Sequence, residues 1–219
     1  MKNKEIKQQA RLQLKGKWGA AALLTLLFAS IYYFIPLIIE INLSGGFTAW
    51  VNKPESVDGP AVSTFVITLV LLPLYIGYLW TFLSVIRTGE KIKFSSLLQA
   101  FSEISMYLRI LGTYLVMMVY MFLWTLLLVI PGIIKAFSYS QTYFVLRDHP
   151  GIGINAAITQ SRKLMDGYKW RFFVLQLSFI GWGILCLLTL GIGFLWLSPY
   201  ITASYAAFYE NLVRQQEEA

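Results

Sequence analysis

The sequence has few charged residues. Only 13% of its 219 residues are Asp, Glu, Lys or Arg, whereas 57% are hydrophobic. A water-soluble domain of ordinary composition carries about 25% charged residues. The chain therefore has too little polar surface to cover a water-soluble globule, and its composition predicts an integral membrane protein.

Residues with reactive side chains are equally scarce. The sequence holds one cysteine, Cys186, and one histidine, His149. A single cysteine excludes an intramolecular disulfide, and His149 has no second histidine or cysteine near it in sequence to complete a metal site. No phosphate-binding loop, dinucleotide-binding glycine motif, nucleophile elbow or metalloprotease helix occurs. We therefore expect no enzymatic activity, no catalytic residues, no metal and no cofactor.

Long apolar runs take up most of the chain. They are residues 19–41, 61–86, 107–130, 133–146, 172–190 and 192–209. Most reach the length of about 18 apolar residues expected of a membrane span. Lipid offers the backbone no hydrogen-bond partner, and the runs are too long for barrel strands, so they must be helical. The sequence predicts an all-α membrane protein with about six transmembrane helices.

The fourth run, residues 133–146, is too short for a straightforward span. Its 14 residues reach only about 21 Å as a helix, against a hydrocarbon core of about 30 Å. One interpretation is a short or tilted hairpin after Pro131 and Gly132, in which Lys135 extends outward. Four spans combined with buried half-helices is the alternative.

The basic residues predict how the chain is oriented. Six Lys or Arg residues precede Gly19, one lies within residues 42–60, four lie within residues 87–109 and five within residues 147–171. If all six runs cross, sixteen of the eighteen basic residues face one side. Such an excess is typical of the cytoplasmic side. We expect a multi-pass protein of the cell membrane with both termini in the cytoplasm.

The runs suggest one domain, residues 1–219, built from three similar hairpins. Its predicted parts are a basic lead-in (1–17), a hairpin (19–86), an amphipathic connector (87–106), a hairpin (107–146), a basic amphipathic connector (147–171) and a hairpin (172–212). The segments from Arg11 to Trp18 and from Arg162 to Trp170 match best: each has Arg, then Gly five residues later, then Lys-Trp. Short amphipathic helices are expected in the lead-ins.

Ionisable residues inside apolar runs are the first candidates for a functional site. Glu40 and Lys135 would both lie near the outer face, where they could pair and join two hairpins, or contribute to a site for a solute or a lipid headgroup. Nearby polar residues could hold helices together or line a small cavity. The complete candidate set is Glu40, Lys135, Tyr139, Gln141 and Thr202.

A second candidate region is the basic cytoplasmic face. Its lipid- or partner-binding residues are Arg11, Lys17, Trp18, Arg162, Lys163, Lys169 and Trp170. Lys and Arg at such a surface each contribute about 1 kcal/mol of attraction to anionic lipid. The lead-ins could lie along lipid headgroups or form a docking surface for a protein. Asp148 and Asp166 are expected to pair with Arg147, Arg162 or Lys163.

Several strings of residues resemble those of a known family. They are Ile130-Pro-Gly-Ile, Tyr139-Ser, Ser161-Arg-Lys-Leu-Met-Asp-Gly-Tyr-Lys, Leu177-Ser-Phe-Ile-Gly-Trp and Gly191-Ile-Gly-Phe-Leu-Trp-Leu-Ser-Pro-Tyr. With the segment from Arg11 to Trp18, they make nearly the whole chain resemble the bacterial membrane family called domain of unknown function 975. The resemblance implies a bacterial cytoplasmic membrane. The family has no established catalytic residues to transfer.

Two functions agree with these features. The first is a non-enzymatic membrane accessory or scaffold that binds anionic lipid headgroups or a partner protein through its basic face. The second is a small transporter or lipid-handling permease, since many transporters contain repeated units with sites between them. We expect membrane lipids as partners, a membrane protein as a further partner, and no nucleic acid.

Overall fold

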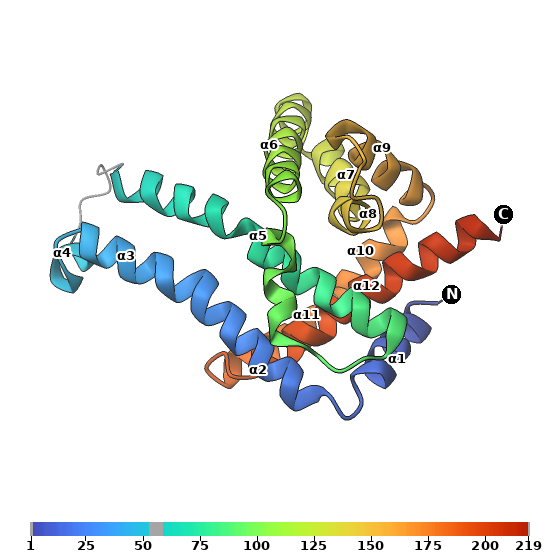
Figure 1. Ribbon diagram of the computed structural model, residues 1–219, viewed down its shortest axis with the longest axis horizontal. Helices are drawn as coiled ribbons and strands as arrows, with labels where there is room; N and C mark the ends of the chain where they lie inside the picture. The colour runs from blue at the N-terminus through green and yellow to red at the C-terminus, as the bar shows by residue number, and fades with distance from the viewer. Residues whose placement is uncertain (1, 53–58, 219) are drawn as a thin grey trace.

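The structure is a computed structural model that describes residues 2–52 and 59–218 (Figure 1). Every regular element in these residues is a helix, and they contain no β-strand. The predicted all-α fold is confirmed. Among the described residues, four helical segments are long and apolar enough to cross a membrane: Trp18–Leu43, Phe65–Thr88, Ile104–Leu127 and Lys169–Leu188. The predicted number of six spans is not confirmed.

The first two candidate spans form an antiparallel pair (Figure 1). One consists of α2 (Trp18–Ala29), a π-helical stretch η1 (Ser30–Phe34) and α3 (Ile35–Leu43), which follow each other without interruption. The wide turns of η1 end just before Pro36, whose nitrogen has no hydrogen to donate to the preceding turn. After the short helix α4 (Phe47–Val51), the chain returns as α5 (Gly59–Thr88).

Helix α12 (Phe194–Glu217) lies against α1 (Asn3–Leu14), α2 and α5. Ala203, Ala206 and Ala207 are fully buried, and these small side chains let the other helices approach closely. Although α12 is as long as a span, it is not among the four apolar candidates. Its tyrosines, serines and threonine are tolerated because much of the helix is covered by protein rather than by lipid.

A 3₁₀ segment, η2 (Phe94–Phe101), packs against the middle of α5. A Cβ atom at Gly77 would lie 2.1 Å from the carbonyl oxygen of Leu97, so only glycine permits this approach. Gln99 Nε2 also donates to the Gly77 carbonyl oxygen at 3.1 Å. The connector of residues 87–106, expected to lie along the membrane surface, is therefore partly folded back onto a candidate span.

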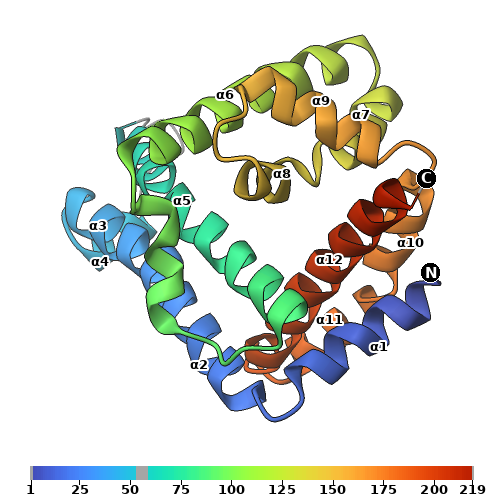
Figure 2. The ribbon, with the colours of Figure 1, turned by 45° about the vertical axis from the view of Figure 1, so that its right-hand side comes forward.

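Helix α6 (Ile104–Leu127) crosses α5 rather than running alongside it. In Figure 1, α6 is seen almost end-on, whereas α5 extends across the page. Figure 2 shows α7 (Val129–Tyr139), α8 (Thr142–Asp148) and α9 (Ile154–Leu164) gathered beside α6. The second predicted hairpin thus differs in arrangement from the first, and a threefold hairpin repeat is not confirmed.

Two of the predicted runs are interrupted helices. Residues 133–146 are divided between α7 and α8, which are separated at Ser140 and Gln141, and they are not among the candidate spans. Residues 172–190 are divided between α10 (Lys169–Leu177) and α11 (Ile180–Leu188), which together form one candidate span. Hydrophobicity predicted the runs but could not indicate where each helix breaks.

Candidate anion-binding site

Basic residues from three helices converge on one open pocket of about 290 Å³. Helix α7 contributes Lys135, α9 contributes Arg162 and Lys163, and α10 contributes Lys169. The remaining lining residues are Ser138, Thr159 and Asp166. We call this cavity the basic pocket.

The amphipathic sequence of α9 places its basic residues at the pocket. Ala157, Ile158 and Leu164 are buried, as the helical spacing predicts, whereas Arg162 and Lys163 remain exposed. The buried Ser161 hydroxyl donates to the Ser138 carbonyl oxygen at 2.8 Å and accepts from the Gln141 backbone N–H at 3.2 Å. These bonds attach α9 to the break between α7 and α8, which sets Arg162 beside Lys135.

An aromatic compartment of about 260 Å³ adjoins the basic pocket. The two cavities share Lys135, Thr159 and Arg162. The Lys135 ammonium lies 4.3 Å from the centre of the Trp124 ring, a cation–π contact that orients the side chain. On the far side, the Tyr120 hydroxyl donates to Asn155 Oδ1 at 3.1 Å. Basic groups therefore lie next to aromatic rings and neutral hydrogen-bonding groups.

The charge at the basic pocket is unbalanced. Of the described residues that line it, Asp166 carries the one carboxylate. This residue pairs with Lys169 at 3.3 Å, and its side chain stays 84% exposed. In residues 2–52 and 59–218, Lys135, Arg162 and Lys163 form no ion pair within 4.0 Å. The pocket can therefore attract an anion, and arginine and lysine are the groups that bind phosphate oxygens.

The predicted intramembrane site does not form one cluster. Lys135 and Tyr139 both line the aromatic compartment. Glu40 lies on α3, where Trp50 Nε1 donates to its Oε1 at 3.2 Å, and α3 is far from α7 in both ribbon views (Figures 1 and 2). Glu40 and Lys135 are not brought together, so the predicted pairing is wrong. Helix crossing, which decides their separation, cannot be deduced from the charges alone.

The other two residues of that set are buried elsewhere. Gln141 is fully buried at the break after α7, and its Nε2 donates to Ser140 Oγ at 2.9 Å. Thr202 on α12 lines a separate aromatic cavity of about 480 Å³ beside α2 and α5. The five predicted residues therefore lie in four different places.

The predicted basic face is divided into two areas. Arg162, Lys163 and Lys169 line the basic pocket, and Trp170, which is 72% exposed, lies close to Phe173. The remaining members belong to α1, α2 and the turn between them: Arg11, Lys17 and Trp18. Lys17 Nζ donates to the Gly89 carbonyl oxygen, and Trp18 makes an edge contact with Tyr200.

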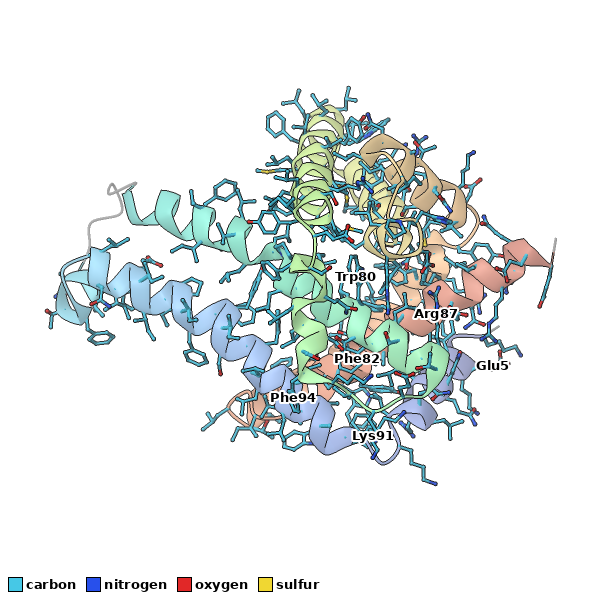
Figure 3. The ribbon with its side chains drawn as sticks, in the orientation of Figure 1. Glu5, Trp80, Phe82, Arg87, Lys91 and Phe94 are labelled. Atoms are coloured by element: carbon cyan, nitrogen blue, oxygen red, sulfur yellow. The ribbon has the colours of Figure 1, made fainter. Side chains whose placement is uncertain are left out.

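A charged cluster joins the ends of α5 and α8 to α12, and the sequence did not predict it. Arg87, labelled in Figure 3, pairs with Asp148 and with Glu210, each at 2.6 Å. The Tyr209 hydroxyl donates to Asp148 Oδ2 at 2.6 Å. The expected partners of Asp148 and Asp166 were therefore wrong, since Asp166 pairs with Lys169. The position of these charges at helix ends was the one available signal.

Comparisons with known proteins identify a family and no individual relative. The model of the family described as "Protein of unknown function (DUF975)" matches residues 1–138 and 125–216. No curated protein and no solved structure matches. Within the described residues, no group of three His, Cys, Asp or Glu side chains could hold a metal ion.

Proposed function

The chain belongs to the DUF975 family, and we propose that it is a non-enzymatic membrane accessory protein that binds the headgroup of an anionic lipid in its basic pocket. One observation carries this proposal. Lys135, Arg162, Lys163 and Lys169 converge from three helices on a pocket lined by a single carboxylate. An ion pair with a phosphodiester would offset this excess of positive charge.

The exposed apolar surface beside the pocket supports a ligand that is a lipid. Leu126, Leu127, Leu128, Val129 and Ile130 are each at least 67% exposed. They lie between Trp124 and Lys135 in the chain, so they belong to the same end of α6 as the pocket. Such a patch is stable in contact with acyl chains, while Trp and Lys favour the adjoining interface. A headgroup at that interface is within reach of the basic side chains.

The adjoining aromatic compartment suggests which headgroups fit. Its Tyr120 hydroxyl and Asn155 amide can hydrogen-bond to the hydroxyl groups of a glycerol headgroup joined to the phosphate. The guanidinium of Arg162 can bind two phosphate oxygens at once, whereas each lysine acts as a point charge. We therefore favour phosphatidylglycerol-type lipids as the first ligands to test.

The remaining parts of the proposal concern location. Among the described residues, four helical segments are apolar enough to cross a membrane. A multi-pass protein with cytoplasmic termini is part of the proposal, and the excess of basic residues on one side supports it if all six apolar runs cross. An acidic membrane protein is the alternative partner for the same basic surface. The lipid experiment tests the lipid alone, because it measures the mass of lipid bound to the purified protein.

The direct test measures lipids bound to the purified protein by native mass spectrometry. The protein is placed in phosphatidylcholine nanodiscs with or without phosphatidylglycerol, and Lys135→Gln/Arg162→Gln is compared with the unaltered chain. Removing two cations of about 1 kcal/mol each lowers phosphatidylglycerol affinity roughly 30-fold. Lys91→Gln is the matched control, because Lys91 is exposed and lines neither cavity.

Equal phosphatidylglycerol retention by the double variant and the unaltered chain would contradict the proposal. Thermal melting of each variant in detergent separates lost binding from lost folding. Lys135→Arg/Arg162→Lys, which keeps both charges, is expected to retain most of the binding.

A further inference from the structure

An open groove of about 810 Å³ lies between α1 and α10. Its α1 side carries Lys4, Lys7, Arg11 and Leu12, and Ser178 and Tyr200 lie opposite. Basic residues from successive turns of one helix therefore face a single cavity. We call it the α1 groove.

We propose that the α1 groove is a second anionic-lipid site, which holds a lipid phosphate between Lys7 and Arg11. The proposal is independent of the basic pocket, because the two cavities share no lining residue. Helices α1 and α9 are also well separated in both ribbon views (Figures 1 and 2).

The lining of the groove carries an excess of positive charge, which favours binding of an anion. Among the residues that the structure describes, its lining includes three basic residues and no carboxylate. Lys7 and Arg11 are one helical turn apart, a spacing at which like charges repel each other. Burial, together with the Arg11 guanidinium, lowers the pKa of Lys7. A phosphate bound between the two side chains would relieve this repulsion.

Aromatic rings hold both cations in position before any ligand binds. Lys7 Nζ lies 4.6 Å from the centre of the Phe179 ring, and the Arg11 guanidinium lies 5.8 Å from the centre of the Tyr200 ring. Lys7 Nζ also donates to Ser178 Oγ at 3.1 Å. These contacts restrict the two long side chains, so less conformational entropy is lost on binding.

The rim of the groove favours a lipid over free phosphate. Leu12 is 60% exposed and Val174 is 38% exposed, and both line the cavity. Helix α1 ends at Leu14, only a short turn before the candidate span that begins at Trp18. The groove therefore borders two candidate spans, the one that follows α1 and Lys169–Leu188, which carries the lining residues Val174 and Ser178. A lipid there can place its phosphate on the cations and its acyl chains on the apolar rim.

The experiment compares two proteins by native mass spectrometry from nanodiscs containing phosphatidylglycerol. Both carry Lys135→Gln/Arg162→Gln, which removes binding at the basic pocket, and one of them also carries Lys7→Gln/Arg11→Gln. Phosphatidylglycerol affinity is expected to fall roughly 30-fold when the two groove cations are removed. Lys15→Gln is the control, because it removes one charge next to α1 without altering the lining of the groove.

Two further measurements, together with the affinity of the groove variant, test the proposal. Lys7→Arg/Arg11→Lys keeps both charges and is expected to retain binding, whereas loss of binding in this variant would contradict the proposal. Unchanged phosphatidylglycerol affinity in Lys7→Gln/Arg11→Gln would overturn it. Soluble glycerol phosphate is added as a competitor. If its affinity for the groove equals that of phosphatidylglycerol, the assignment to a membrane lipid is overturned. Failure at this groove leaves the basic-pocket result unaffected, because the two sites are removed by different substitutions.

Discussion

Arg87 holds the carboxylate of Asp148 with two hydrogen bonds, from Nη1 to Oδ1 at 2.6 Å and from Nη2 to Oδ2 at 2.8 Å. The two residues are 61 positions apart in the chain. The remaining Arg87 donor, Nε, reaches Glu210 on α12 at 2.6 Å. A single guanidinium therefore connects α5, α8 and α12.

Replacing Arg87 by alanine is expected to lower the free energy of unfolding by about 2 kcal/mol, the scale of a hydrogen bond to a charged group. The loss arises because Asp148 and Glu210, whose side chains are only 18% and 12% exposed, would keep their charge without this partner. Thermal melting in detergent measures the change. Lys91→Ala is the control, because Lys91 is exposed, and an equal effect of both substitutions would argue against this role of Arg87.

The same pair predicts a dependence of stability on pH. Burial by itself raises the pKa of Asp148, but hydrogen bonds from Arg87 and Tyr209 outweigh it and hold the pKa below its ordinary value. A carboxyl whose pKa is lowered by folding stabilises the folded state above the unfolded pKa, which is about 3.9 for Asp. This stabilisation is lost as pH falls from about 4 through the lower folded pKa.

Melting temperatures of the unaltered chain and Asp148→Asn, measured across pH, check this expectation. The unaltered chain should be more stable at neutral pH, and its advantage should shrink as pH falls below about 4. An advantage that stays constant into strong acid would show that the charge of Asp148 does not stabilise the fold.

Gly77→Ala is expected to destabilise the protein by about 1–3 kcal/mol, the range typical of overpacking. The added Cβ would meet the Leu97 carbonyl oxygen at 2.1 Å, so α5 and η2 would have to separate. Gly183→Ala is the matched control, because that helical glycine has no neighbouring atom within 4 Å of an added Cβ. A thermal melt that ranks the two variants equally would contradict the close packing of η2 on α5.

The sequence predicted features that depend on neighbouring residues of one helix, and it did not predict contacts between helices. The burial of Ala157, Ile158 and Leu164 was predictable, because residues three and four apart lie on one face of a helix. The association of Lys135 with Arg162 was not predictable from the sequence, because it depends on the Ser161 hydroxyl that joins α9 to the end of α7. Glu40 was assigned to the wrong partner for the same reason: its charge says nothing about how α3 and α7 are placed.

The long apolar runs were enough to predict a helical chain suited to a membrane, because lipid leaves no other way to satisfy their backbone. The family and the excess of basic residues outside those runs could also be read from the amino-acid sequence. Three features became known from the folded structure: Gly77 admits η2 against α5, Arg87 pairs with Asp148, and basic residues gather in two separate cavities. Those outcomes depend on contacts between residues far apart in the chain, which local periodicity and charge do not specify.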